Sequence, residues 1–189
     1  MPDDVLDAIH ARRSVGRVSP EPLPRETVEE LLEAAVSAPN HHQTCPWRFI
    51  VLAGNARREV GEAHARAVAR VRPDLTPETR EQEASRFGRA PVVIACCVRP
   101  GEDPVEARED RDAVAAAIQN MLLAAQARGL GGIWRTGTMA DEPEVREALA
   151  LEERDAIVGL VYLGRLPDGV VPRGPERAGA EGVTEWRGW

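Results

Sequence analysis

The sequence predicts one globular domain that combines helices and strands. Its 189 residues suffice for a single domain with a sizeable buried core. Between residues 28 and 36, apolar side chains follow the i, i+3, i+4, i+7, i+8 spacing of a helix that buries one stripe. Residues 92–98 are apolar without alternation, which is typical of a strand buried on both faces. No internal repeat or interdomain linker is visible, so the domain is expected to span residues 1–189.

Composition narrows the class of protein. Hydrophobic residues make up 43% of the chain and charged residues 29%, which is ordinary for a soluble globular protein. No apolar run approaches the roughly 18 residues of a membrane helix, and the first residues are acidic where a signal peptide is basic. A cytoplasmic protein without a membrane segment is therefore expected. The net charge of −7 argues against nucleic acid as a partner.

The elements can be placed in chain order. Helices are predicted over 3–12, 24–38, 56–71, 112–128 and 141–149, and strands over 47–52, 92–98 and 157–163. In the first helix, an aspartate at position 3 or 4 is the expected cap, and Val5, Leu6 and Ile9 are expected to face the core. Residues 72–89 are polar and charged, and the sequence leaves two alternatives for them, a helix or a partly mobile segment that forms a lid.

The helix over 112–128 indicates a second copy of the chain. It is apolar almost all round, with Gln119 and Asn120 as its main interruptions, so it must be buried on all sides. One small domain has too little surface to do this alone, and we expect a homodimer through this helix. Beyond Gly164 the chain is rich in Gly, Pro and Arg, and this tail, 165–189, is expected to be disordered or to wrap the partner.

Several common chemistries are absent from the sequence. It contains no phosphate-binding loop of the G-x-x-x-x-G-K-[ST] type, no G-x-S-x-G nucleophile elbow and no H-E-x-x-H zinc motif. Cys96 and Cys97 are adjacent in an apolar run, so they are expected to be buried small hydrophobes on opposite faces of a strand. The four histidines lack ligand spacing, and no metal is expected.

Three clusters suggest a binding site. The first, Arg12-Arg13-Ser14 with Arg17, is either a local anion site or a set of charges that complements a helix dipole. The second is the loop 38–47, in which two prolines bracket polar side chains between a helix and a strand. The third is 131–137, where the Trp-Arg pair is either a cation–π packing contact or, given the flanking glycines, a place where a ligand approaches the backbone.

Together these clusters resemble the nitroreductase family, and most closely its small single-domain members. The chain has an early R-R-S, an A-P-N-H loop that closes on P-W, then G-G-I-W-R-T-G after a buried helix, and V-G-L-V-Y-L-G. The likeness covers about residues 9–164, in the family's order and spacing. It implies an α+β fold, with a central, mainly antiparallel sheet flanked by helices, and a homodimer that binds FMN in its interface.

The resemblance also implies a set of cofactor-binding residues. Arg12, Arg13 and Ser14 would hold the phosphate and ribityl end of FMN. The flavin contacts would come from the helix end and loop and from the third cluster: Ser37, His41, Trp134, Arg135 and Thr136. The segment 123–128 corresponds to the place where relatives bind a nicotinamide donor. A tail cation, Arg165 or Arg173, would reach the phosphate. The sequence departs from the family pattern at two positions: it has a small Ser37 where some relatives have a long basic residue, and Cys45 where relatives commonly have a polar one.

The implied activity is that of an oxidoreductase in which the flavin carries the chemistry and no side chain acts as a nucleophile. NADH or NADPH would deliver hydride, and a nitroaromatic, a quinone or a similar small acceptor would then replace it in a ping-pong cycle. Two alternatives remain open. One is a member of the same family with different chemistry, such as dehydrogenation or aldehyde reduction. The other is an FMN-binding protein without turnover.

Overall fold

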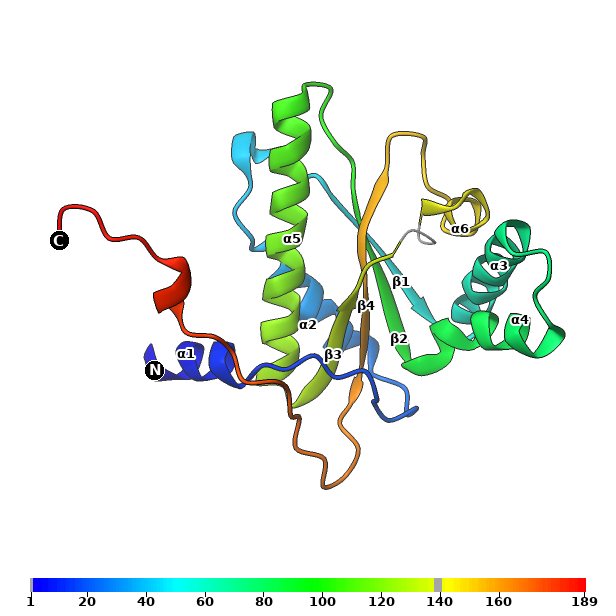
Figure 1. Cartoon of the computed structure of the whole chain (residues 1–189), viewed down its shortest axis with the longest axis horizontal. Coiled ribbons are helices and arrows are strands. Elements are labelled where there is room, and N and C mark those ends of the chain that lie inside the picture. Colours follow the sequence, from blue (N-terminus) through cyan, green and yellow to red (C-terminus); the bar gives the residue numbers. More distant parts are fainter. Residues whose placement is uncertain (1, 138–140) are drawn as a thin grey trace.

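The computed structural model describes residues 2–137 and 141–189, and the side chains from Val5 onward within this range. The fold is α+β, as the sequence indicated: a four-stranded antiparallel sheet has helices on both faces (Figure 1). The helices are α1 Pro2–Ala11, α2 Arg25–Val36, α3 Asn55–Val71, α4 Pro77–Ala84, α5 Pro104–Ala127 and α6 Pro143–Ala148. The strands are β1 Trp47–Ala53, β2 Val92–Val98, β3 Leu130–Arg135 and β4 Ala156–Arg165. Three 3₁₀ turns are η1 His41–Gln43, η2 Ser85–Arg89 and η4 Ala180–Val183.

The sheet separates two apolar clusters. Its strand order is β1-β2-β4-β3, and all seven residues of β2 are buried, as predicted for a strand covered on both faces. Alternate side chains of β2 enter opposite clusters: Cys96 packs with α2 and α5, whereas Cys97 packs with α3, η2 and α6. The expectation for the two cysteines is therefore confirmed. Burial raises the pKa of both thiols, that of Cys97 to about 12, so neither is a nucleophile at neutral pH.

Helix α5 begins eight residues earlier than predicted. Asp103 caps it by accepting hydrogen bonds from the backbone N–H groups of Val105 and Glu106, and Pro104 occupies the first turn. Gly129, with φ of 68°, ends it in the left-handed conformation that glycine adopts without strain. The helix buries one stripe: Asp110, Ala113, Val114, Ala117, Ile118, Met121, Leu122 and Ala125.

Two expectations about apolar burial are not met within one chain. Gln119 on α5 is exposed and Leu123 is only partly buried, so the helix is not covered on all sides. The prediction that α1 turns its apolar residues inward is wrong, because Val5, Leu6 and Ile9 are 61%, 56% and 38% exposed. Figure 1 shows the reason: α1 lies to one side of the sheet, near the end of α5, and nothing in the described chain covers its apolar face.

The polar segment that the sequence left open is ordered into α4 and η2. Thr76 caps α4 by accepting a hydrogen bond from the Thr79 N–H, and Pro77 stands at its start. Helix α4 packs tightly on α3, where a Cβ added at Gly61 would lie 2.1 Å from the carbonyl oxygen of Ala84. Residues 77–89 therefore form packed secondary structure on the α3 side of the sheet.

The C-terminal tail leaves the body of the domain. Figure 1 shows that it runs past α1 and away from the sheet. Val183, Trp186 and Trp189 are 88%, 71% and 99% exposed, although they are large apolar side chains. Within residues 2–137 and 141–189, no helix is long and apolar enough to cross a membrane, and no three His, Cys, Asp or Glu side chains form a metal-binding group.

One buried carboxylate joins three strands at one end of the sheet. Asp155, just before β4, is 2% exposed and forms ion pairs with Arg48 of β1 and Arg99, which follows β2. It also accepts a hydrogen bond from the backbone N–H of Glu152. Burial alone would raise the pKa of Asp155, but the hydrogen bonds from Arg99, Glu152 and Arg48 outweigh it and lower this pKa.

We expect Asp155→Asn to lower the free energy of unfolding at pH 7 by roughly 2–3 kcal/mol, since it removes the charge from hydrogen bonds to two guanidiniums. A lowered folded-state pKa stabilises the protein above the unfolded value of about 3.9 and is lost as pH falls below it. The variant should therefore lose less stability than the wild type between about pH 5 and 2. Urea unfolding across this range measures both effects. Asp168→Asn, at an exposed position, is the control. If the two variants lose the same free energy of unfolding at pH 7, the prediction is contradicted.

Candidate functional site

The basic turn after α1 lies along the free edge of β3. Ser14 pairs with Gly132 in a parallel bridge, and the Val15 N–H donates to the Gly132 carbonyl oxygen at 2.9 Å. The strand can be approached this closely because it carries no side chain at the contact. A Cβ added at Gly131 would lie 2.8 Å from Val18. The glycines of the third cluster thus let the first cluster lie beside it. The positions of the two clusters in the sequence did not predict this contact.

Three guanidiniums gather at the C-terminal end of α1. Arg177, from the tail, donates to the carbonyl oxygens of Ile9 and Arg12, and Arg13 donates to those of His10 and Arg12. Both side chains therefore complement the helix dipole, as the simpler interpretation of this cluster required. Arg12 differs from them, because its guanidinium makes no hydrogen bond or ion pair to a described residue.

Arg12 is half-buried among like charges. Burial lowers the pKa of Arg12, and the neighbouring charges of Arg177 and Arg13 lower it further. Neither Arg12, Arg13 nor Arg177 forms an ion pair in the described part of the chain, although the protein as a whole carries a charge of −7. Uncompensated cations packed together are stabilised by an anion, and a phosphate group has the charge and the acceptor oxygens to do this.

Trp134 and Arg135 bring buried, unpartnered donors to strand β3, Trp134 on the face covered by α5 and Arg135 on the face of Tyr162. Trp134 Nε1 and Arg135 Nε are buried without a hydrogen-bond partner among the described residues. The Arg135 guanidinium lies 5.7 Å from the centre of the Tyr162 ring, and a Cβ at Gly16 would lie 3.3 Å from its Nη2. Arg135 therefore reaches from the sheet to the basic turn. A cation–π contact is present, but it leaves part of the guanidinium unsatisfied.

Gly159 makes room for the Trp134 indole. A Cβ at Gly159 on the neighbouring strand β4 would lie 1.9 Å from Trp134 Nε1. Any larger residue would displace the indole or push β3 and β4 apart. The glycine of V-G-L-V-Y-L-G thus belongs to the site as a neighbour of Trp134. Thr136, one residue past β3, is exposed at the end of the strand.

The loop between α2 and β1 has an unusual backbone. His42, Gln43 and Cys45 all have positive φ, at 54°, 53° and 49°, which is uncommon for residues other than glycine. Such conformations persist only where surrounding contacts impose them, and they concentrate at functional sites. His41 is exposed on this loop, and Ser37 ends α2 with its hydroxyl donating to the Glu33 carbonyl oxygen.

Asp110 of α5 holds this loop in place. Its carboxylate, 4% exposed, accepts from the Thr44 hydroxyl at 2.6 Å and from the Gly101 N–H at 2.8 Å. The Asn40 amide in turn donates to the Thr44 hydroxyl and to the His41 carbonyl oxygen. The loop is thereby fixed to the N-terminal half of α5.

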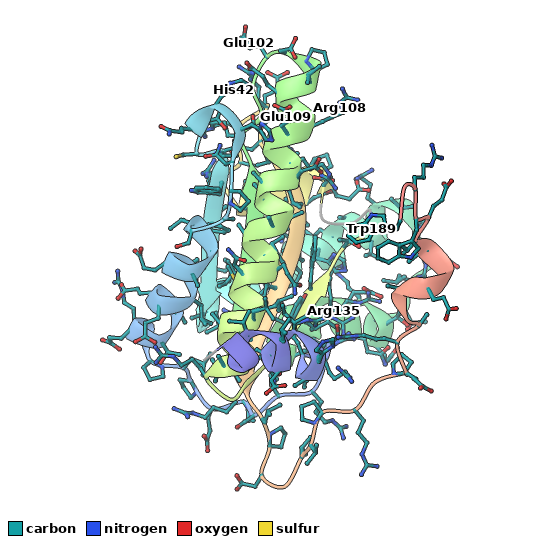
Figure 2. The ribbon with its side chains drawn as sticks, turned by 90° about the vertical axis from the view of Figure 1, so that its left-hand side faces the viewer. His42, Glu102, Arg108, Glu109, Arg135 and Trp189 are labelled. Atoms are coloured by element: carbon teal, nitrogen blue, oxygen red, sulfur yellow. The ribbon has the colours of Figure 1, made fainter. Side chains whose placement is uncertain are left out.

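The predicted site residues fall into two groups that one chain does not bring together. The first group lies along β3: Arg12, Arg13, Ser14, Trp134, Arg135 and Thr136. Ser37 and His41 lie beside α5 instead. Figure 2 shows this separation, with His42 and Glu109 near the start of α5 and Arg135 far along the molecule. Arg128, in the segment 123–128, is paired with Glu30 at 2.7 Å.

The first group suits a ligand that carries a phosphate. Its half-buried cations lack carboxylate partners, and its two orphaned N–H donors face no described acceptor. Sequence reasoning missed Arg177 and considered Arg165 and Arg173 instead. Nothing in the tail sequence distinguishes these arginines, because the contact depends on where the chain turns back toward α1.

The chain was compared with known proteins at the level of sequence family and of structure. The family model described as "Nitroreductase family" matches residues 9–165. "Putative NAD(P)H nitroreductase YdjA" from Escherichia coli (strain K12) is 34% identical over 163 residues, which cover 85% of this chain and 87% of that protein.

Two solved structures are similar over almost their whole length. A nitroreductase-like family protein from Bacillus cereus matches with a TM-score of 0.85 and 26% identity, over 98% of this chain and 96% of that one. A nitroreductase with bound FMN from Bacteroides fragilis NCTC 9343 matches with a TM-score of 0.76 and 25% identity, over 97% and 98%. The fold is thus the nitroreductase fold, and the resemblance found in the sequence is confirmed.

Proposed function

Because this chain belongs to the nitroreductase family, we propose that it is an FMN-dependent oxidoreductase that takes electrons from NADH or NADPH. The observation that carries this proposal is the half-buried Arg12, which lies beside Arg13 and Arg177 without a carboxylate. The FMN phosphate would supply the missing negative charge and accept hydrogen bonds from the guanidiniums. The similar Bacteroides fragilis nitroreductase, which has bound FMN, supports the choice of cofactor.

The residues along β3 would bind and orient the cofactor. Arg12 would pair with the phosphate, and the Ser14 hydroxyl lies within the same segment to accept or donate a further hydrogen bond. Trp134 would offer its unpartnered indole N–H to FMN, and Arg135 would offer part of its guanidinium, which carries five N–H donors in all. Thr136 lies at the end of the same strand. FMN supplies hydride acceptance and donation when it is bound, so the protein needs no nucleophilic side chain.

The site would be completed by a second copy of the chain. The loop with His41 is tied to the N-terminal half of α5 through Thr44 and Asp110, and Ser37 lies at the end of α2 just before this loop. Both residues would therefore contact the cofactor bound mainly by the partner. Apolar side chains that a partner would cover are exposed on α1 and on the tail. We therefore propose a homodimer of single-domain subunits, with a core over about 9–164 and the tail 165–189 wrapped on the partner.

The acceptor would be a nitroaromatic, a quinone or a similar small molecule. The name of the Escherichia coli relative, a putative NAD(P)H nitroreductase, supports the nitro compound among these acceptors. Dehydrogenation or aldehyde reduction on the same cofactor remains an alternative, because family membership does not fix the acceptor. An FMN-binding protein without turnover is the second alternative.

Anaerobic reduction separates these alternatives. The purified protein should be yellow, and NADH or NADPH should bleach the flavin absorbance without oxygen. Addition of a para-substituted nitrobenzene or a benzoquinone should then restore the flavin absorbance within one turnover. Bleaching that neither acceptor reverses would favour dehydrogenation or aldehyde reduction as the activity. A stable yellow protein that neither donor bleaches would show a binding protein without turnover, and a colourless protein that does not take up FMN would refute the proposal.

Removal of Arg12 should weaken FMN binding more than riboflavin binding. Loss of one guanidinium that contacts a phosphate costs about 1.5–3 kcal/mol, which is roughly ten- to a hundredfold in affinity. Riboflavin has no phosphate, so its affinity should barely change in Arg12→Ala. Flavin fluorescence titrations of the apoprotein measure both ligands. Arg12 is a sharper test than Arg13, because Arg13 also stabilises the end of α1.

The matched control is Arg80→Ala, an exposed arginine on α4 far from the basic turn. It should leave both affinities unchanged. If Arg12→Ala weakens FMN and riboflavin equally, or neither, the cluster does not bind the phosphate.

Leu6→Glu should dissociate the dimer without unfolding the subunit. Leu6 is 56% exposed on α1, so a glutamate is tolerated in the single chain but would be desolvated against a partner. Sedimentation velocity at micromolar concentration should show a dimer for the wild type and a monomer for the variant, with loss of FMN. Val71→Glu, at an equally exposed apolar position at the end of α3, should remain dimeric. A wild-type monomer, or a Leu6→Glu dimer, would contradict the proposed interface.

A further inference from the structure

A cavity opens on the face of the sheet that α3 and η2 cover. Its volume is about 360 Å³, within the size range of pockets that hold small organic ligands. Phe87, Ile133, Leu160 and Tyr162 form an apolar and largely aromatic wall. Phe87 and Tyr162 are only 3% and 6% exposed, so the wall offers an apolar surface for the body of a small organic ring and no open ring face for stacking. The cavity adjoins the residues proposed above to bind flavin, because Trp134 and Thr136 also line it.

The polar lining of the cavity is cationic. Arg86 and Arg89 come from η2, and Arg135 comes from β3. Their guanidiniums lie close enough to the Tyr162 ring to oppose the rise that burial causes in the pKa of its phenol. The cavity therefore presents positive charge next to an aromatic surface.

Two of these charges lack a counterion. Arg86 is paired with Glu83, which also contacts His64 at 3.1 Å, so the charge of Arg86 is compensated within the protein. No ion pair involves Arg89 or Arg135 among the described side chains. Arg135 Nε is in addition buried without a hydrogen-bond partner among the described residues, and such a group destabilises the protein until a ligand or water satisfies it.

We propose that this cavity binds an aromatic carboxylate, with the ring against the apolar wall and the carboxylate between Arg89 and Arg135. A carboxylate is planar and accepts paired hydrogen bonds from guanidiniums, whereas an amide of the same shape offers them no charge. The ligand's use as an electron acceptor rests on the function proposed above. Its binding in the cavity depends on the apolar wall and on Arg89 and Arg135, whatever the reaction is.

The test compares two molecules that differ in one charge. Isothermal titration of the purified holoprotein should give at least about tenfold tighter binding for 4-nitrobenzoate than for 4-nitrobenzamide. Arg89→Gln should remove most of this preference by weakening the benzoate and leaving the amide unchanged. Arg89 is exposed, so the variant is expected to fold, and circular dichroism checks this.

Two controls define the outcome. Arg72→Gln removes the same charge at the exposed end of α3, outside the cavity, and should keep the preference of the wild type. Inorganic phosphate should compete far less well than 4-nitrobenzoate, because it cannot use the aromatic wall. Equal binding of both molecules by the wild type, equal loss in Arg72→Gln, or equally strong competition by phosphate would each overturn the proposal. The flavin content of the same samples, from their absorbance, reports separately on the proposed function.

Discussion

The structure depends on one constraint: the central strands of the sheet are apolar on both faces, so both faces must be covered. Strand β2 is buried along its whole length, and its side chains alternate between two separate clusters. Helices α2 and α5 close one face, and α3, η2 and α6 close the other. Since the core occupies both faces, polar groups that bind a ligand lie mainly at the free edge of β3, beside the cavity next to η2, at the ends of the sheet and on the loops.

The candidate site lies at the free edge of β3, which the two covered faces of the sheet leave accessible. Glycines at 131 and 164 let the chain around Val18 lie against the sheet, where any larger residue would collide with it. The basic turn, the end of α1 and the tail then meet beside β3. The result is a group of cations without carboxylates in a protein of net charge −7, and a local charge of this kind indicates an anionic ligand.

The same arrangement leaves the single chain incomplete. The loop with His41 is held in a strained conformation by Asp110, through Thr44, at the opposite end of α5 from the basic turn. At the same time α1 and the tail expose large apolar side chains that no described residue covers. The homodimer proposed above would cover this apolar surface and would bring the loop of one subunit to the cofactor site of the other.

The sequence by itself determined the α+β class, the family and most elements, because these depend on local patterns. The uninterrupted apolar run of β2 and the apolar stripe of α2 are properties of neighbouring residues. Strand β2 is buried as predicted, and the stripe of α2 buries Val28, Leu31 and Ala35 but leaves Val36 exposed. The orientation of α1 was predicted wrongly, since its apolar residues Val5 and Leu6 follow the usual pattern but have no surface in this chain to cover. Tertiary structure alone decided that Arg177 joins Arg12, that Arg135 faces Tyr162, and that His41 lies apart from both. Those contacts join residues distant in sequence, and only the path of the folded chain brings them together or keeps them apart.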